Sequence, residues 1–351
     1  SIGEAVPFVD GECPNHLLIP NSDRTECVLP GRIDVGRHFL TFGGFEGMKE
    51  KAEKSISRLL PFMHYAFDLK KYPLMEKLFA SEYFINSAKD VCPPDQQYLD
   101  PFQVNFILQI PSQSVALHVD GVYFWGADRF LYPQWLLAVM KFSGLFEEQF
   151  ISQIQVVAYL HEWDDPSREG MFVHFNNKNG KPTRIPPTPR FGSVIDGSKV
   201  VHAATIYKGK EGSTAPTLAK DKPNMLQYVG RDNWEVFDGE KVVANYTTDD
   251  LRISLVFRAR CFANEEEAKE NQRMRDNHEG LSQEFVLETL KKDMRDNKNI
   301  NIPEDISAMD LALLLLDTYI AYPKPETWMP FNYCMVSKVV PSLSPLVDLL
   351  C

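Results

Sequence analysis

The chain has 351 residues, of which 44% are hydrophobic, 12% aromatic and 24% charged, and this is the composition of a globular protein. It excludes wholesale disorder, collagen and coiled coil, and no apolar run reaches the roughly 18 residues that a membrane span needs. The formal net charge of −11 disfavours nucleic acid as a partner, because a polyanion attracts basic surfaces. We therefore expect neither nucleic acid nor a membrane among the partners.

The cysteines are scattered along the chain and form no CxxC or Cys/His cluster, so a zinc finger is not expected. Disulfide frameworks are typical of short secreted chains. We predict free thiols and a cytoplasmic protein. The opening SIGEAVPFVDGE lacks the basic and apolar regions of a signal peptide, although the missing initiator Met leaves open that a leader was removed. The six cysteines are Cys13, Cys27, Cys92, Cys261, Cys334 and Cys351.

The predicted elements fall into three parts along the chain. Residues 1–40 are rich in Gly, Pro and Asp and predict an irregular arm, whereas 45–90 carry apolar residues at helical spacing, interrupted at Pro61. From about 103 to 262, short β-branched and aromatic segments are separated by Gly, Pro, Asn and Asp, which favours a sandwich or barrel of strands. After residue 263 the pattern predicts three further helices.

Two stretches depart from the strand pattern of the β region. WLLAVMKFSGLFEE predicts a helix, and 209–248 begin as a Gly-, Pro- and Lys-rich loop and end as a hairpin turning at Asp238-Gly239. The layout indicates a single catalytic domain over 1–351. Its parts are an N-terminal arm with helices (1–100), a β core (101–262) with an insertion (209–248), and a C-terminal helical region (263–351).

The sharpest local pattern is His118-Val119-Asp120, at the end of the strand SVALHVD. Residues i and i+2 of a strand project from one face, so an imidazole and a carboxylate point into the same space. His202 follows in a later short strand and completes a set of two histidines and one carboxylate, which holds Fe(II) and leaves coordination positions open. A histidine that only hydrogen-bonds a nearby carboxylate is the alternative.

The late strand LRISLVFRAR carries basic residues on one face. Arg252, Ser254, Arg258 and Arg260 alternate with apolar residues, and buried guanidinium groups need partners. An arginine followed by a serine two residues later suits a carboxylate ligand, through a bidentate fork and a hydroxyl hydrogen bond. The alternative is an edge strand with a solvated basic face.

The order of these features resembles the Fe(II)/2-oxoglutarate-dependent dioxygenase superfamily over about residues 100–262. The resemblance implies a mainly β protein with flanking helices, in which N- and C-terminal α-helices brace a double-stranded β-helix (jelly-roll) core. It also implies Fe(II) as the metal, 2-oxoglutarate as the cosubstrate and ascorbate as a candidate reductant. The residues it implies are the metal ligands His118, Asp120 and His202 and the 2-oxoglutarate-binding Arg252 and Ser254.

The arginine usually follows the second histidine closely in this superfamily, whereas here 209–248 intervene. Lys208 or Lys210 is therefore an alternative anchor, as a lysine serves in the prolyl-hydroxylase branch. Arg258 has the spacing of a second arginine that lies near the iron-binding carboxylate in some branches. The residues expected to line the substrate or cosubstrate pocket are Tyr123, Arg129, Gln155, Tyr159 and Arg258.

We predict an oxygenase that uses 2-oxoglutarate and dioxygen to hydroxylate, desaturate or cyclise a small natural-product substrate in biosynthesis. Arg129, Arg258 and Arg260, if not otherwise paired, favour an acidic or amino-acid-like substrate. A protein or peptide hydroxylase of the same superfamily is the alternative within the enzymes. A non-catalytic jelly-roll binding module and a cupin-like metalloenzyme that uses no 2-oxoglutarate are the competing classes of protein.

Overall fold

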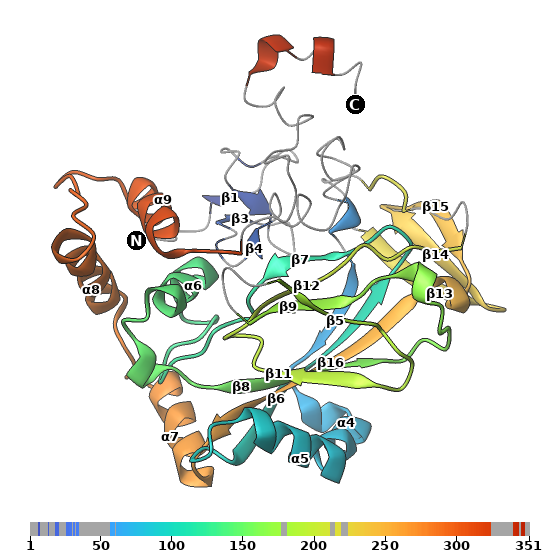
Figure 1. Cartoon of the computed structure of the whole chain (residues 1–351), viewed down its shortest axis with the longest axis horizontal. Coiled ribbons are helices and arrows are strands. Elements are labelled where there is room, and N and C mark those ends of the chain that lie inside the picture. Colours follow the sequence, from blue (N-terminus) through green and yellow to red (C-terminus); the bar gives the residue numbers. More distant parts are fainter. Residues whose placement is uncertain are drawn as a thin grey trace.

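The strands in the described part of the chain form two five-stranded and two three-stranded sheets, flanked by helices (Figure 1). Within the described chain, no helix is both long enough and apolar enough to cross a lipid bilayer. The computed structural model describes residues 61–176, 181–210, 215–218 and 224–323, residues 57–59, and short pieces within 6–34 and 340–347.

One five-stranded sheet, here named the arginine sheet, has the antiparallel order β11-β8-β16-β6-β5. Its central strand β16 puts Arg252 and Ser254 on one face, while Leu255 and Phe257 pack on the other face in an apolar cluster with α4 and α5. The predicted separation of faces is therefore confirmed. The strands are β5 (Phe62–Ala66), β6 (Tyr98–Gln109), β8 (Gln153–Tyr159), β11 (Gly192–Ile195) and β16 (Arg252–Phe262).

The second five-stranded sheet, the histidine sheet, has the order β10-β9-β12-β7-β4. Its strands are short, and β12 lies between β7 and β9, antiparallel to both. This places His202 directly across from His118 on one side and from His174 on the other. The strands are β4 (Ile33–Asp34), β7 (Val115–His118), β9 (Phe172–Phe175), β10 (Thr183–Ile185) and β12 (Val201–Ala204).

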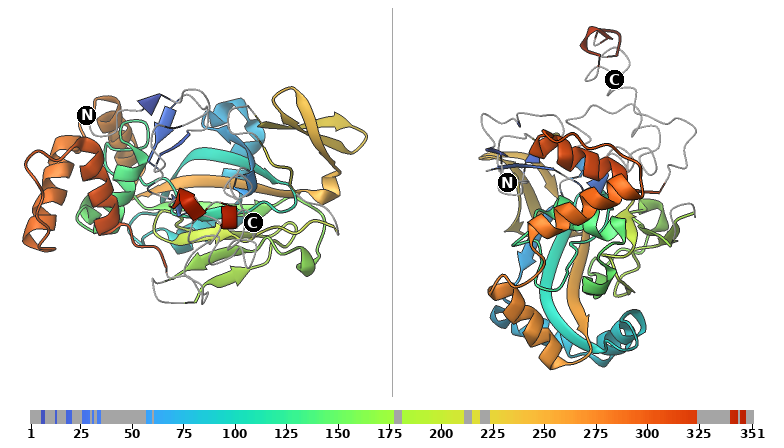
Figure 2. Two further views of the ribbon diagram at one scale, coloured as in Figure 1. Left: turned by 90° about the horizontal axis from the view of Figure 1, so that it is seen from above. Right: turned by 90° about the vertical axis from the view of Figure 1, so that its left-hand side faces the viewer.

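The two five-stranded sheets face each other across an apolar layer (Figures 1 and 2). Val157, Tyr159 and Val256 of the arginine sheet form one buried cluster with Phe172 of the histidine sheet. Because each strand alternates inward and outward residues, the inner faces of both sheets contribute to this layer. His202, Arg252 and Ser254 are buried together with these apolar residues.

Residues 224–246 form a three-stranded antiparallel sheet that pairs with neither five-stranded sheet among the described strands. The predicted hairpin at Asp238-Gly239 is confirmed, since β14 and β15 flank it. Val236 and Tyr246 pack with Ile110 and Leu251, so the small sheet rests on the end of the core where β16 begins. Its strands are β13 (Asn224–Gly230), β14 (Asn233–Asp238) and β15 (Lys241–Tyr246).

The helices cover two sides of the core. Helices α4 and α5 lie on the outer face of the arginine sheet, whereas α6, α8 and α9 share one apolar cluster beside it (Figure 1). The predicted helices in WLLAVMKFSGLFEE and after residue 263 are confirmed. Four helices begin at a residue whose side chain accepts a hydrogen bond from the amide three residues later: Ser81, Asn264, Ser282 and Ser307. The helices are α4 (Pro73–Phe79), α5 (Glu82–Val91), α6 (Gln134–Ser143), α7 (Glu265–Asp276), α8 (Gln283–Asp296) and α9 (Ala308–Tyr319).

The helical expectation for 45–90 is wrong in two places. Residues 62–66 form strand β5, because the edge of β6 offers backbone hydrogen-bond partners and Pro61 ends the preceding turn. The second expected helix is divided into α4 and α5, because Ser81 starts a new helix by capping it. Residues 37–56 lie outside the described residues.

The N-terminal arm is less irregular than its composition predicts. β1 (Val6–Pro7), β2 (Ile19–Pro20) and β3 (Glu26–Val28) form a small antiparallel sheet, and β4 joins the histidine sheet. Short two- and three-residue strands of this kind leave no periodic pattern in a sequence. The expectation of an irregular arm is therefore wrong for these pieces.

Two disulfide bonds overturn the expectation of free thiols for the four described cysteines. Cys13 pairs with Cys27, and Cys92 at the end of α5 pairs with Cys261 on β16. The second bond ties the helical cover to the arginine sheet across 169 residues of sequence. Disulfides form in oxidising compartments, so they disfavour the predicted cytoplasmic location. Cys334 and Cys351 lie outside the described residues.

Candidate metal centre

Two histidines from neighbouring strands form the middle of the site. His118 and His202 are cross-strand partners on β7 and β12, so their side chains leave the histidine sheet on the same face, with ring centroids 4.2 Å apart. The Nδ1 atom of His118 lies 2.7 Å from the carbonyl oxygen of Ala116, and that of His202 lies 2.8 Å from the carbonyl oxygen of Val200. A carbonyl can only accept, so both rings carry their proton on Nδ1 and present the Nε2 lone pair to the interior.

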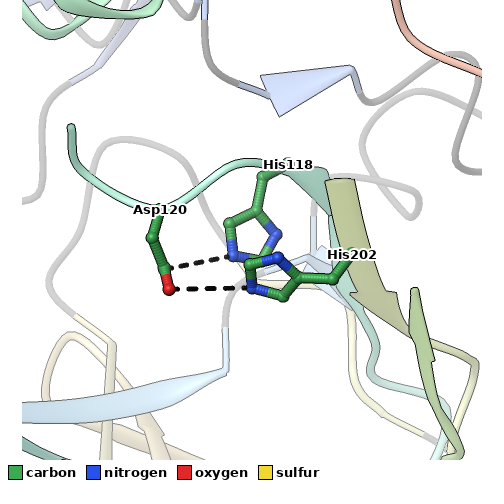
Figure 3. A group of neighbouring side chains, drawn as sticks. All are labelled: His118, Asp120 and His202. Atoms are coloured by element: carbon green, nitrogen blue, oxygen red, sulfur yellow. Dashed lines mark ion pairs between the residues drawn. The ribbon is translucent and has the colours of Figure 1, made fainter. Parts of the chain in front are cut away.

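Asp120 completes the group from a loop, two residues beyond β7. Its backbone amide donates to the carbonyl of Gly197 at 2.9 Å, and the carboxylate turns back toward both imidazoles (Figure 3). One carboxylate oxygen is 3.7 Å from Nε2 of His118, and the other is 3.9 Å from Nε2 of His202. One ligand atom from each of the three residues lies within 4.8 Å of the others, which is close enough to hold a single metal ion.

The space beside Asp120 suits a metal. The Oδ2 atom of this buried carboxylate accepts no hydrogen bond from any described residue, although buried polar atoms in native proteins nearly always have a partner. Gly197 borders the same space, because a Cβ there would lie 2.1 Å from Oδ2 of Asp120 and 3.1 Å from Cε1 of His202. Two imidazole nitrogens and one carboxylate are the donor set of non-haem Fe(II) sites. The residues present therefore fit this metal.

Electrostatics put the ligands into their metal-binding protonation states. Burial alone would raise the pKa of Asp120, but the Arg258 guanidinium, which donates to Oδ1 at 2.8 Å, and the two imidazoles hold that pKa well below its usual range. Burial, followed by the neighbouring His118, lowers the pKa of His202 to about 3. Near neutral pH the site thus holds a carboxylate and a neutral His202, as binding of a divalent cation requires.

Arg252 lies at the start of β16 on the same inner face and is 2% exposed. Its Nε donates to the carbonyl of Gly170 at 3.0 Å, and its Nη1 donates to Oε1 of Gln109 and, at 3.0 Å, to Oγ of Ser254. Its Nη2 is 3.5 Å from the hydroxyl of Tyr159, whose ring centroid is 5.0 Å from the guanidinium carbon. Every one of these partners is neutral.

The absence of an acidic neighbour makes Arg252 a candidate anion anchor. Among the described residues, no carboxylate forms an ion pair with it. Burial lowers the pKa of Arg252, and the groups that act against this lowering are the tyrosines Tyr159 and Tyr207. A buried cation without a counter-ion is costly, and a ligand carboxylate would remove that cost. The Nε2 atom of Gln109 beside it has no hydrogen-bond partner in the described chain and offers such a ligand one further donor.

The two lysines considered as alternative anchors lie at the surface. Lys208 pairs with Glu169, and Nζ of Lys210 is 2.7 Å from the carboxylate of Asp249. Their side chains are 58% and 57% exposed. Both lysines have acidic partners at the surface, whereas the described residues offer Arg252 no acidic partner in the interior.

Three of the residues expected to line the pocket lie beside these two centres. Gln155 places its Nε2 atom 3.3 Å from Nε2 of His202, and no described residue donates to its Oε1. Arg258 binds the metal-ligand carboxylate, and Tyr159 contacts Arg252. These side chains project from β8 and β16, the central strands of the arginine sheet.

The other two expected pocket residues lie in the loop after β7. Tyr123 is buried against Phe102, with ring centroids 5.0 Å apart, in a small apolar cluster with Ile151. Arg129 is partly exposed and stacks on Phe67. The structure therefore brings neither of them into contact with His118, Asp120 or His202 among the interactions of the described chain.

Sequence reasoning missed three residues of the site. Gln109 accepts from Arg252, Gly170 lets that guanidinium approach the backbone, and Gly197 leaves room beside Asp120. The signal for Gln109 is present in QVNFILQ, where polar side chains recur at even spacing in an apolar strand. The two glycines carry no comparable signal, because only the close approach of distant segments gives them a role.

A separate cavity of about 230 Å³ lies behind the metal ligands. Val119 and Val201, which line it, alternate with the ligands along the chain and therefore point to the other side of the histidine sheet. Lys141 and Lys199 also line this cavity.

No family model and no curated protein matches the chain. Several solved structures do match it, and they are Fe(II)/2-oxoglutarate oxygenases. An oxidoreductase of the 2OG-Fe(II) oxygenase family from Burkholderia pseudomallei is 10% identical, with a TM-score of 0.29 over 55% of this chain and 56% of that one. A Pseudomonas putida prolyl-4-hydroxylase is 12% identical, with a TM-score of 0.30 over 62% and 78% of the two chains.

The iron-bound HygX from Streptomyces hygroscopicus is 9% identical, with a TM-score of 0.31 over 58% of this chain and 73% of that one. TM-scores near 0.3 are too low to assign a fold or an activity to this chain. Its functional assignment therefore rests on the arrangement of its own residues, above all on His118, Asp120 and His202.

Proposed function

We propose that this protein is a non-haem Fe(II)- and 2-oxoglutarate-dependent oxygenase. The observation that carries the proposal is the buried group of His118, Asp120 and His202, in which two Nε2 lone pairs and a carboxylate turn toward one another. Arg252 supports it, because a buried guanidinium without a carboxylate partner suits the distal carboxylate of a dicarboxylic cosubstrate. Ascorbate is the reductant we expect to sustain the activity.

We further propose that the two five-stranded sheets are the two walls of a double-stranded β-helix. Successive strands β6, β7, β8 and β9 lie alternately in the arginine and histidine sheets, as do β11, β12 and β16. Such alternation is how a jelly roll winds its chain. In this proposal 1–351 is one catalytic domain, with 101–262 as the core, 209–248 as an insertion, and 1–100 and 263–351 as its supports.

Bound Fe(II) would supply the activation of dioxygen. In the overall reaction 2-oxoglutarate loses carbon dioxide and one oxygen atom of O₂ enters succinate, while the other enters the substrate C–H bond in a hydroxylation or leaves as water in a desaturation or cyclisation. The residues of this chain hold and orient the reactants. His118, Asp120 and His202 hold the metal, and Arg258 keeps the carboxylate of Asp120 ionised and directed at the imidazoles.

The cosubstrate is bound by the other end of the same inner face. Arg252 offers a bidentate fork to its distal carboxylate, and the Ser254 and Tyr159 hydroxyls lie within 3.5 Å of the guanidinium. Between this anchor and the metal ligands, Val157 and Val256 provide an apolar lining that excludes water. The substrate we propose is small and acidic or amino-acid-like, with a peptide as the alternative.

Anaerobic titration with Fe(II) and 2-oxoglutarate, followed by visible absorption, tests the proposed function. We expect a weak charge-transfer band only when both are present. His202→Ala should remove the band through loss of metal, and Arg252→Ala should shift its half-saturation to higher 2-oxoglutarate. Lys208→Ala is the matched control and should leave the titration unchanged. A metal-free jelly-roll module would bind neither compound, and a cupin-like metalloenzyme would bind metal without responding to the oxoacid.

A further inference from the structure

Three arginines are candidates for recognising an acidic substrate, and two of them are already paired. The Arg258 guanidinium binds Asp120 at 2.8 Å, and Nη2 of Arg260 lies 2.6 Å from the carboxylate of Asp100. Within the described part of the chain, Arg129 forms no ion pair, and the contacts of its guanidinium group are with the rings of Phe67 and Phe130. Arg129 is therefore the one arginine of the three with its hydrogen-bonding capacity left for a ligand.

Two phenyl rings hold Arg129 in place. Its guanidinium carbon is 5.7 Å from the ring centroid of Phe67 and 5.7 Å from that of Phe130. The two rings meet edge to face with centroids 5.8 Å apart. Stacking on aromatic faces leaves the N–H groups at the edge of a guanidinium directed outward, and it reduces the entropy lost when those groups bind a carboxylate.

The rings around Arg129 belong to an exposed apolar patch, here named the aromatic rim, which consists of Met63, Tyr65, Phe67 and Phe130. These side chains are 43%, 40%, 42% and 61% exposed. Tyr65 and Phe67 stack with centroids 6.2 Å apart and an angle of 6° between their planes. Single exposed apolar residues are ordinary, but a contiguous set that surrounds a cation marks a binding surface.

The aromatic rim is continuous with the inner face of the arginine sheet. Tyr65 of β5 is the cross-strand partner of Asn105 on β6, which in turn is the partner of Val256 on β16. Directly paired residues share a face, so Tyr65 lies on the same side of the sheet as Val256 and Arg258, and Phe67 stacks on Tyr65. Two strand spacings of about 4.8 Å separate β5 from β16, so the rim lies roughly 10 Å from the strand that carries Arg258.

We propose that the aromatic rim and Arg129 bind an apolar carboxylic acid of small size, with the carboxylate on the guanidinium and the apolar body on the rings. The proposal rests on the proposed function, since it makes the rim the outer part of the substrate site. It deepens that function by stating the substrate class as a carboxylic acid with an aromatic or aliphatic body. The distance to β16 leaves room for such a body to reach toward the metal ligands.

Ligand-observed NMR with phenylacetate and phenylacetamide as probes tests this inference. The two probes share a ring and differ in charge. Metal-free protein with excess 2-oxoglutarate is used, so that neither the metal nor Arg252 contributes a second acid site. We expect millimolar binding of phenylacetate and binding of the amide weaker by about tenfold, the value of a charge-assisted hydrogen bond. Arg129→Gln should abolish this preference.

The matched control is Arg295→Gln, which removes an exposed arginine on α8 and should keep the preference. Phe67→Leu, which keeps an apolar side chain but removes one stacked ring, should weaken phenylacetate binding less than Arg129→Gln does. Circular dichroism checks that each variant is folded. Equal binding of acid and amide to the unmodified protein, or a preference that survives in Arg129→Gln, overturns the inference.

A short peptide ending in phenylalanine is the competing probe. If it binds more than about tenfold tighter than phenylacetate, the rim is a peptide site and the small-acid proposal is wrong. These measurements need no metal, so they remain informative if the charge-transfer titration fails. A preference for the acid without that band would keep the carboxylate site and reject the oxygenase, and the reverse result would reject the site alone.

Discussion

The two ends of the interior between the five-stranded sheets differ in how their charges are balanced. At one end Asp120 is neutralised by Arg258, and two imidazoles face it with their lone pairs. At the other end the hydrogen-bond partners of Arg252 among the described residues are hydroxyl, amide and carbonyl groups. The first end has electron-pair donors directed at one another, and the second has a buried cation that no carboxylate among the described residues pairs with.

This difference shows which ion each end requires. A folded protein seldom buries unpaired donors or charges without a compensating function, because each costs free energy. The metal end is therefore suited to a divalent cation, and the Arg252 end to a carboxylate. One ligand that reaches both, a 2-oxo dicarboxylic acid, would satisfy the two ends together. Variants that change one end while the affinity of the other end is measured can separate them.

The largest effect is expected from His202→Ala, which removes a ligand at the metal end. Changes around a metal ligand already cost about 10–100-fold in affinity, so loss of the ligand itself should lower Fe(II) affinity by about a hundredfold or more and abolish turnover. Equilibrium dialysis with metal analysis measures the affinity. 2-Oxoglutarate should still protect the metal-free variant against thermal unfolding through Arg252. Full metal content in this variant would show that His202 is no ligand.

Arg252→Ala changes the other end. The loss of a buried charge-assisted interaction costs about 3 kcal/mol, so the affinity for 2-oxoglutarate should fall by about a hundredfold. Fe(II) affinity without the cosubstrate should stay within a few-fold of the original. Isothermal titration calorimetry measures both. If Lys210→Ala produces the larger loss instead, the anchor lies at the surface and the contrast between the two ends is wrong.

Gly197→Ala disturbs the metal end more gently. The new Cβ would lie 2.1 Å from Oδ2 of Asp120, so the carboxylate has to move away from the histidines. We expect Fe(II) affinity to fall by about tenfold, the lower range for changes beside a ligand, with the affinity for 2-oxoglutarate less affected. Gly121→Ala is the matched control, because its Cβ meets nothing within 4 Å. Equal losses in both variants would contradict this account of Gly197.

The smallest effect on either end is expected from Cys92→Ala. Removal of the bond to Cys261 should lower the free energy of unfolding by about 2–4 kcal/mol, because the unfolded chain loses a long-range constraint. Fe(II) and 2-oxoglutarate affinities should not change, since the bond lies on the outer face of β16. Urea unfolding followed by fluorescence measures stability, and calorimetry measures the affinities. A change in either affinity would show that the disulfide influences the geometry of the site.

The sequence by itself determined the candidate ligands and the arginine face. HxD at a strand end, a later strand histidine and an arginine–serine alternation are local patterns with a period of two, and the structure brings His118, Asp120 and His202 within reach of one metal. Helices α6, α8 and α9 were equally predictable, because each combines apolar spacing with a defined start or end, whereas α7 is a charged helix that begins after Asn264. These features follow from the local spacing of residue types, and the tertiary packing is consistent with that spacing.

The tertiary structure alone decided the remaining features. Residues 62–66 became a strand because β6 had an edge to pair, and Cys92 met Cys261 because α5 lies on β16. The positions of the carboxylates in the fold determine which arginines are paired, as Arg258 is with Asp120 and Arg260 with Asp100. Residue types and their spacing are properties of the sequence, whereas pairing, tautomer and burial arise from segments far apart in the chain, and these decide which polar groups remain for a ligand.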